Sequence, residues 1–282
     1  MSQRPKWWRA IAALVVLLAP LPFLVGAFVE AHSTPLVRRV ALERPDWPKG
    51  QPPVTMALLS DLHVGWPSRS PEDLARIAAQ VDALHPDLIL IAGDFLAGHR
   101  ARTILEDETL LAPLSNLHAP LGVVAVLGNH DYWGAGARLV PVLERHGVTV
   151  LRNAAVARGP LAIAGVDDPV TGHDEVETAV RAVRALPGAR VVLAHSPEVV
   201  DELPPDLGLL LAGHTHCGQV RLPFFDPNGP HWPYIRYECG VVRDPGRTVV
   251  VSAGIGTSVA PLRLGAPPDF WLITLGGPGM KP

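Results

Sequence analysis

The sequence predicts an α/β protein, in which a layered domain follows an apolar N-terminal helix. Apolar runs of strand length alternate with longer stretches of helical spacing, as in layered α/β proteins. Acidic, imidazole and amide side chains follow the ends of several of these runs. A charge-free segment of 20 residues precedes all of them. With 282 residues and 48% hydrophobic content, the chain can bury a sizeable core.

The N-terminal segment, "AIAALVVLLAPLPFLVGAFV" at residues 10–29, predicts a membrane anchor. As a helix it would be roughly 30 Å long, which matches the hydrocarbon core of a bilayer. Basic residues precede it at positions 4, 6 and 9, which favours a cytoplasmic N-terminus and an extracytoplasmic body. We therefore expect a single-pass protein of the cytoplasmic membrane, anchored by residues 1–29.

Two alternatives to the anchor remain open. Pro20 and Pro22 interrupt the helix, and the small residues ending at Ala27 suit signal cleavage, which would give a secreted protein. A buried core helix is the other alternative. The length of the apolar segment and its basic flank favour the anchor.

Three further parts follow the anchor. Residues 30–53 are rich in proline and charge and predict a linker, or an irregular lead-in to a domain. The layered domain is expected at 54–276, followed by a tail at 277–282. Its largely buried strands are expected at 54–60, 87–93, 122–128, 161–166, 189–195 and 207–213, and its helices at 71–85, 136–147 and 174–188. The last third is expected to be mostly sheet.

Charge and cysteine content exclude several classes of protein. With 24 basic and 27 acidic residues and a net charge of −3, the chain has no basic track for nucleic acid, and nothing indicates a protein partner. Two cysteines are too few for a disulfide framework or a zinc ribbon and leave the redox compartment open.

Metal-binding side chains recur just past the ends of the predicted strands. In open α/β sheets this edge binds ligands, because the strands hold the converging loops rigidly. The residues in question are Asp61, His63, Asp94, Asn129, His130, Asp131, His195, His214 and His216.

The spacing of these residues indicates paired metal ligands. Asp61 and His63 are two residues apart, as are His214 and His216, so in extended backbone each pair would point to one side. Carboxylate, imidazole and amide together suit Mn²⁺, Fe²⁺ or Zn²⁺. Seven ligands from among these nine residues are too many for one tetrahedral ion, and they predict two cations that share a carboxylate.

Five motifs in order carry a family resemblance: "SDLHVG", "AGDF", "GNHDYW", "AHSP" and "GHTHCGQV". Together with "VSAGIGTSVAPLRL", they resemble the calcineurin-like metallophosphoesterases from about Val54 to Leu275, and most nearly the membrane-associated bacterial branch of YaeI-type phosphodiesterases. The resemblance implies a two-sheet αββα sandwich flanked by helices.

The resemblance also implies a role for each matching residue. Asp61, His63 and His216 would hold one divalent metal; Asn129, His195 and His214 would hold the second; and Asp94 would bridge them. His130 would donate a proton to the leaving oxygen or stabilise charge on it. Asp131 would orient that imidazole and raise its charge through a hydrogen bond.

The expected chemistry is hydrolysis of phosphoester or phosphodiester bonds by a hydroxide that bridges the two metals. One alternative is hydrolysis of a lipid-linked diphosphate, resembling UDP-2,3-diacylglucosamine pyrophosphatases, since the anchor would bring the enzyme to a lipid substrate. Another is an inactive membrane-tethered scaffold of the same fold. The substrate is thus a phosphoester, either soluble or lipid-linked.

Several further residues are not among the predicted metal ligands. Cys217, beside His216, is expected to project away from the ligands and to be a bystander with an oxidisable thiol. Arg263, Tyr132, Trp133, Trp66 and His231 are candidates for a substrate groove, although packing or surface roles are favoured for them. "GIGTS", residues 254–258, is expected to be a turn at a strand end.

Overall fold

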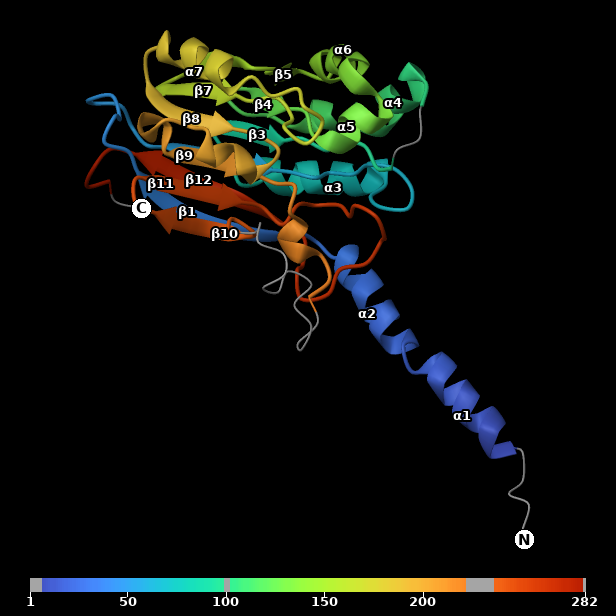
Figure 1. Ribbon diagram of the computed structural model, residues 1–282. Helices are drawn as coiled ribbons and strands as arrows, with labels where there is room; N and C mark the ends of the chain where they lie inside the picture. Colours follow the sequence, from blue (N-terminus) through green and yellow to red (C-terminus); the bar gives the residue numbers. More distant parts are fainter. Residues whose placement is uncertain (1–6, 99–101, 222–235, 281–282) are drawn as a thin grey trace.

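A computed structural model of the chain describes residues 7–98, 102–221 and 236–280. The described chain forms two six-stranded sheets that stack face to face, with helices on their outer faces (Figure 1). This is the αββα sandwich predicted from the sequence. Two apolar helices at the N-terminus project away from this body.

The first sheet has the strand order β1-β12-β2-β3-β4-β5. Its strands β2, β3, β4 and β5 run parallel to one another, and β12 lies antiparallel to β2. The bounds are Leu36–Glu43 (β1), Val54–Leu59 (β2), Leu88–Ala92 (β3), Val123–Val126 (β4), Val148–Val150 (β5) and Asp269–Gly276 (β12).

The second sheet has the order β10-β11-β9-β8-β7-β6. Its four central strands, β11, β9, β8 and β7, are parallel, and an antiparallel strand closes each edge. The bounds are Ala154–Arg158 (β6), Leu161–Gly165 (β7), Ala189–Leu193 (β8), Leu209–Ala212 (β9), Gly240–Asp244 (β10) and Arg247–Val251 (β11).

Alternation along the strands creates three apolar layers. Met56 and Leu58 of β2 face Leu193 and Leu211 of the other sheet across the central core. The outer face of the first sheet is covered by α3 (Pro71–Asp82), α4 (Ile104–Leu111) and α6 (Leu139–Arg145). The outer face of the second is covered by α7 (Val176–Arg184). A short helix, α5 (Asn129–Gly134), follows β4.

The N-terminal segment forms two consecutive helices, α1 (Trp7–Leu18) and α2 (Leu21–Ala31), which meet at Pro20. The prolines therefore interrupt the helix as expected, because Pro cannot donate the backbone bond that would continue it. The window Leu14–Ala31 has a mean hydropathy of 2.2 and is only 11% buried, which argues against a buried core helix. By length and composition the segment can cross a membrane.

Strand β1 lies within residues 30–53, where the sequence predicted a linker without regular structure. That expectation was wrong for Leu36–Glu43, which pairs in parallel with all of β12. The alternating pattern of β1 was hard to recognise because the strand lies at the sheet edge and buries little besides Leu42. The chain thus passes from α2 directly into the sheet (Figure 1).

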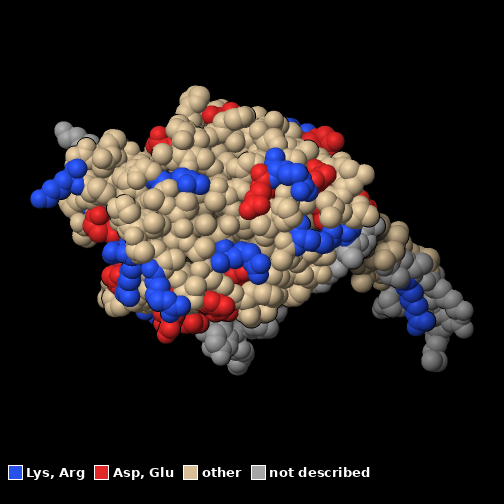
Figure 2. Space-filling view, turned by 90° about the horizontal axis from the view of Figure 1, so that it is seen from above, with Lys and Arg blue, Asp and Glu red and all other residues tan. Residues whose placement is uncertain are grey.

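Charges on the surface occur in small mixed groups. On the face seen in Figure 2, basic and acidic side chains lie beside one another, separated by larger uncharged areas. Exposed ion pairs such as Arg184–Asp206, with 2.6 Å between nitrogen and oxygen, are of this kind. Such pairs contribute little to stability.

Candidate metal centre

The predicted polar residues converge at the carboxyl ends of the strands, where the loops of both sheets meet. The loops after β2, β3 and β4 come from the first sheet, and those after β8 and β9 from the second. Eight of the nine side chains are buried, and His214 is partly exposed. The prediction that strand ends gather these residues is confirmed.

The backbone brings the ligand pairs together by a different route from the one expected. Five of these residues have positive φ: Asp61 (49°), His63 (43°), Asp94 (56°), His214 (71°) and His216 (51°). The extended-backbone argument for the two pairs was therefore wrong. Left-handed backbone is strained for residues with a Cβ, and such strain concentrates at functional sites. Here it bends each loop inward immediately after its strand.

Two glycines leave space for the carboxylates at the centre of the site. A Cβ on Gly128 would lie 2.4 Å from Oδ1 of Asp94 and 2.8 Å from Nδ1 of His195. A Cβ on Gly213 would lie 2.5 Å from Oδ2 of Asp61. At both positions any larger residue would displace a candidate ligand. Glycine is therefore required because the ligand side chains approach the backbone closely, more than because the backbone turns here.

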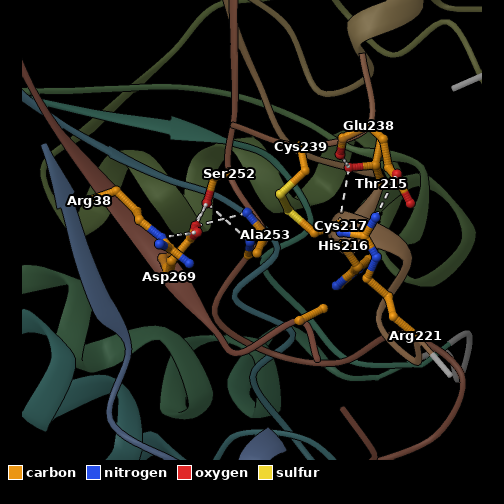
Figure 3. The surroundings of a disulfide bond; sticks show 12 residues. Arg38, Thr215, His216, Cys217, Arg221, Glu238, Cys239, Ser252, Ala253 and Asp269 are labelled. Carbon is orange, nitrogen blue, oxygen red and sulfur yellow. Dashed lines mark hydrogen bonds and ion pairs between the residues drawn. A yellow bond between two sulfur atoms is a disulfide. The ribbon is translucent and has the colours of Figure 1, made fainter. Parts of the chain in front are cut away.

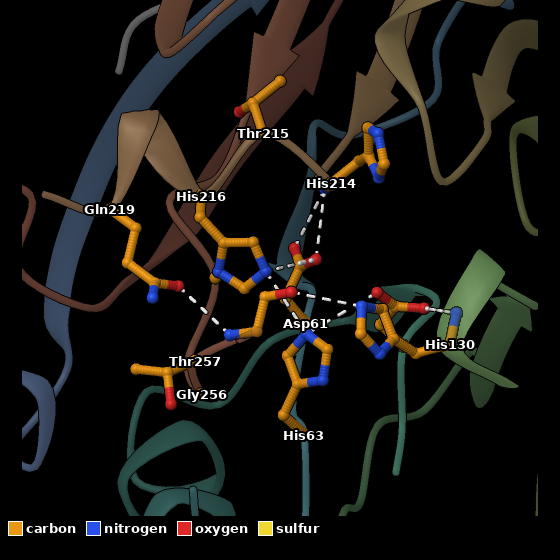
Figure 4. A network of polar contacts seen from close by, with 12 residues as sticks. Asp61, His63, His130, His214, Thr215, His216, Gln219, Gly256 and Thr257 are labelled. Atoms are coloured by element: carbon orange, nitrogen blue, oxygen red, sulfur yellow. Dashed lines mark hydrogen bonds and ion pairs between the residues drawn. The ribbon is translucent and has the colours of Figure 1, made fainter. Parts of the chain in front are cut away.

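One half of the site contains Asp61, His63 and His216 (Figure 4). Nε2 of His63 lies 3.2 Å from Nε2 of His216. Nε2 of His216 lies 3.3 Å from Oδ1 of Asp61. The Asp61 carboxylate also accepts the backbone N–H of His214, at 3.1 and 3.2 Å, which links this half to the next loop.

The other half contains Asn129, His195 and His214. Nε2 of His195 lies 3.0 Å from Oδ1 of Asn129 and 3.2 Å from Nδ1 of His214. Nδ1 of His195 donates to the carbonyl of Ala92 at 2.7 Å, which fixes the ring and turns Nε2 toward the site. Oδ2 of Asp94 lies between the halves, 3.5 Å from Nε2 of His63 and 3.3 Å from Nε2 of His195.

These separations suit divalent cations. Two ligand atoms that each bind one ion at about 2.1 Å lie roughly 3.0 to 3.5 Å apart at tetrahedral or octahedral angles. The donor atoms in both halves are spaced in this range. Nitrogen and carboxylate oxygen donors without thiolate suit Mn²⁺, Fe²⁺ or Zn²⁺.

The electrostatics of the cluster also favour cations. Burial lowers the pKa of His63 to about 3, so this imidazole is neutral and its nitrogen lone pair is available. Burial alone would raise the pKa of Asp94, but His195 and His63 outweigh it and hold the pKa below its ordinary value. Burial would lower the pKa of His195, yet Asp94 raises it to about 10. In the protein without metal, a proton on His195 thus offsets the charge of Asp94.

His130 is buried beside His63 and Asp94. Its Nε2 is 3.1 Å from the hydroxyl of Ser258, and its ring meets the edges of His63 and Trp133 at centroid distances of 4.8 and 5.0 Å. Its backbone N–H donates to Oδ1 of Asp94 at 2.8 Å, which places the ring beside the shared carboxylate. Ser258 was not predicted individually, although "GIGTS" was correctly expected to be a turn after a strand.

Asp131 does not contact the imidazole of His130 as the resemblance implied. Its Oδ2 accepts the backbone N–H groups of Asp94 and Gly128 at 2.9 and 3.0 Å, and its Oδ1 accepts that of Phe95 at 2.8 Å. Burial, followed by the nearby Asp94, raises its pKa to about 7. Asp131 therefore ties the loop after β3 to the loop after β4 and positions Asp94.

The two cysteines form a disulfide between Cys217 and Cys239 (Figure 3). The expectation of an oxidisable bystander thiol was wrong, although Cys217 lies outside the candidate ligand groups. Cys217 also has positive φ, 51°, so the extended-backbone reason for its direction fails. Beside the disulfide, Thr215 donates to the carbonyl of Glu238 at 2.6 Å. The loop carrying His214 and His216 is thus fastened to the start of β10.

Arg263 does not line a phosphate groove. It is fully buried, and its guanidinium donates to the carbonyls of Ala253, Gly256 and Ala266 at 2.6 to 2.9 Å. Tyr132 is likewise engaged, since its hydroxyl binds Asp167 at 2.6 Å. Trp133 and Trp66 are exposed near the site, and His231 lies outside the described residues.

Comparison with known proteins identifies the family of this site. Residues 54–218 match the family described as calcineurin-like phosphoesterase, and this range includes every candidate ligand. The chain belongs to this family. As a calcineurin-like phosphoesterase it is a metal-dependent hydrolase of phosphoester bonds, and the family uses a dinuclear metal centre.

Similar proteins share most of their length with this calcineurin-like phosphoesterase. An uncharacterised Bacillus subtilis protein, YpbG, is 31% identical in an alignment that spans 90% of this chain and 89% of YpbG. An uncharacterised Aquifex aeolicus metallophosphoesterase is 30% identical over 91% of this chain and 98% of its own. A zebrafish (Danio rerio) transmembrane protein with a metallophosphoesterase domain is 28% identical over 93% of this chain and 62% of its own.

Proposed function

We propose that the protein is a dinuclear phosphoesterase in which Asp61, His63 and His216 hold one cation, Asn129, His195 and His214 hold the other, and Asp94 bridges both. The observation that carries this proposal is the position of Asp94. One of its carboxylate oxygens lies 3.5 Å from His63 in the first half and 3.3 Å from His195 in the second. A single oxygen placed in this way can bind two ions at once.

The cations, when bound, supply a water of lowered pKa and positive charge opposite the phosphoryl oxygens. The protein contributes the remaining functions. Its buried loops exclude bulk water from the ligands, and Asp131 keeps the bridging carboxylate in place. His130 carries the proton for the leaving oxygen at its imidazole, and Ser258 holds Nε2 of that ring at 3.1 Å.

Hydrolysis of bis(p-nitrophenyl) phosphate by full-length protein tests this function. We expect turnover that requires Mn²⁺ or another divalent ion and stops with EDTA, together with two metal equivalents by elemental analysis. Well-folded protein that binds two equivalents but releases no nitrophenol would instead favour a membrane-tethered scaffold. Elemental analysis of protein purified without chelator would also identify the metal.

We further propose that residues 1–29 remain as a single-pass anchor and that the catalytic domain lies outside the cytoplasm. The disulfide supports this orientation, because such bonds persist in oxidising compartments and are rare in the cytosol. Alkylation of thiols in intact cells, followed by mass spectrometry, tests it. Cys217 and Cys239 should resist alkylation, and protease added to spheroplasts should digest the domain. Free thiols in cells would contradict this orientation.

A further inference from the structure

Half of the large exposed hydrophobic side chains outside α1 and α2, among the described residues, lie close in sequence to site residues. Outside α1 and α2, the described residues include eight large exposed ones, at positions 36, 66, 104, 105, 133, 170, 220 and 259. Trp66, Trp133 and Val220 each follow a site histidine by three or four residues. Val259 follows Ser258 directly and is 92% exposed, and Trp66 is 90% exposed. Four of these eight side chains therefore belong to segments that also carry site residues.

A groove of about 820 Å³ lies between the loop after β2 and helix α4. Its apolar walls include Trp66, Pro67, Leu105 and Leu110, and Leu105 is 72% exposed. Its polar members make internal bonds: Arg102 donates to the carbonyl of Ala97, and Thr103 caps α4 with Glu106. Its lining includes Gly65 and Ala97, which follow His63 and Asp94 by two and three positions, so the same two loops carry proposed metal ligands and groove residues.

Helix α2 is docked on a loop that also forms the site. The backbone N–H of Arg263 donates to the carbonyl of Ala27 at 2.9 Å, and that of Ala266 donates to Glu30 at 3.1 Å. The same loop, between β11 and β12, carries Gly256, whose N–H binds the Asp61 carbonyl at 2.7 Å, and Ser258 beside His130. Figure 1 shows this loop at the junction between the body and α2.

From these three observations we infer that the substrate is an amphiphile drawn from the membrane that holds α1 and α2. Its phosphoester lies at the metal centre, and its alkyl or acyl chain lies in the groove between Trp66 and Leu105. This inference rests on the proposed phosphoesterase function. The rim of the site is formed by the exposed side chains Trp66, Trp133 and Val259. These side chains contact the bilayer surface, where a tryptophan ring is favoured.

The apolar groove recognises the alkyl or acyl chain of the substrate. A soluble phosphodiester would leave the groove walls at Leu105 and Leu110 in water, whereas a long alkyl or acyl chain removes apolar surface from water on both partners. Because α2 ends on the loop that carries Gly256 and Ser258, the anchor also keeps the rim of the site close to the membrane. A substrate can then reach the metals without leaving the bilayer completely.

Two matched esters test the inference: methyl 4-nitrophenyl phosphate and hexadecyl 4-nitrophenyl phosphate. In both, water adds to phosphorus and nitrophenolate leaves, so only the chain differs. Full-length protein with Mn²⁺ in mixed detergent micelles should show a kcat/KM at least about tenfold higher for the hexadecyl ester, since buried methylenes add binding energy. In Leu105→Asp this preference should fall about tenfold. Asp is compatible with the first turn of α4, so the variant should fold.

Val170→Asp is the matched control, because Val170 is 42% exposed but does not line the groove. It makes the same apolar-to-acidic change and should keep the chain preference. Equal kcat/KM for both esters in the wild type, or equal preference in the two variants, would overturn the inference. If the wild type hydrolyses neither ester with metal, the proposed function itself fails. Enrichment of the enzyme and the hexadecyl ester in the same micelles affects both variants equally, because both retain the anchor. It therefore cannot produce a difference in chain preference between them.

Discussion

Replacing Asp131 by Asn tests whether this residue positions the loops or acts on His130. The Asp131 carboxylate accepts three backbone N–H groups, two at Oδ2 and one at Oδ1. An asparagine amide has one acceptor oxygen, so its NH₂ group must face at least one of these N–H donors. Above the raised pKa of Asp131, where the carboxylate is charged, losing one such hydrogen bond costs about 1.5 to 3 kcal/mol, and the opposed donors add to this cost. We therefore expect Asp131→Asn to lower the free energy of unfolding by about 3 kcal/mol.

The assay is thermal unfolding of the full-length protein in detergent with EDTA, where no metal contributes. For a domain of this size about 3 kcal/mol corresponds to a fall in Tm of roughly 6 to 12 °C. The metal-loaded variant should also bind cations more weakly, because Asp94 loses its backbone support. His130→Ala is the control, since it removes the imidazole and leaves all three bonds to Asp131. Unchanged unfolding and metal affinity in Asp131→Asn, with only an altered pH profile of activity, would refute the positioning role.

Three further outcomes are expected. Asp94→Asn should weaken binding of both metals, and retention of two equivalents at wild-type affinity would contradict the bridging role. His130→Ala should keep its metals and lose more activity, about 10²- to 10⁴-fold, on an alkyl ester than on a nitrophenyl ester; equal losses would exclude leaving-group protonation. Cys217→Ser should lower the free energy of unfolding by about 3 kcal/mol, given the sequence separation of 22 to Cys239, and a matching effect of dithiothreitol on the wild type alone would confirm the cause.

The strands and the gathering of the site could be predicted from the sequence because both depend on local patterns. Uninterrupted apolar runs mark strands buried on both faces, and β2, β3 and β9 lie within the predicted ranges. The carboxyl ends of parallel strands lie at one edge of the sheet. Residues that follow these strands therefore meet at that edge, whatever segments connect the strands. The order of the strands in the two sheets was not predicted, because it depends on long-range pairing.

What the sequence did not reveal depends on backbone conformation and on contacts between distant segments. Positive φ at Asp61 and His216 depends on the tertiary structure, since Asp and His tolerate this conformation better than most residues but adopt it only rarely. The three acceptor bonds of Asp131 come from loops that meet only in the fold. Strand β1 requires its partner β12, which lies more than 200 positions later in the chain. Likewise, two cysteines 22 residues apart do not by themselves indicate a bond.

The parallel pairing of β1 with β12 has a mechanical consequence. In the chain, α2 is followed by β1, so with the proposed anchor in a membrane a pull on the domain would reach the sheet at Leu36, the first residue of β1. Eight residue positions, from Leu36 to Glu43, pair with β12, and a load along the strand is shared among their hydrogen bonds. Peeling would break them one after another, whereas shear strains them together. In the proposed anchored protein, β1 would therefore transmit the force from the membrane to the domain by shear across all eight paired positions.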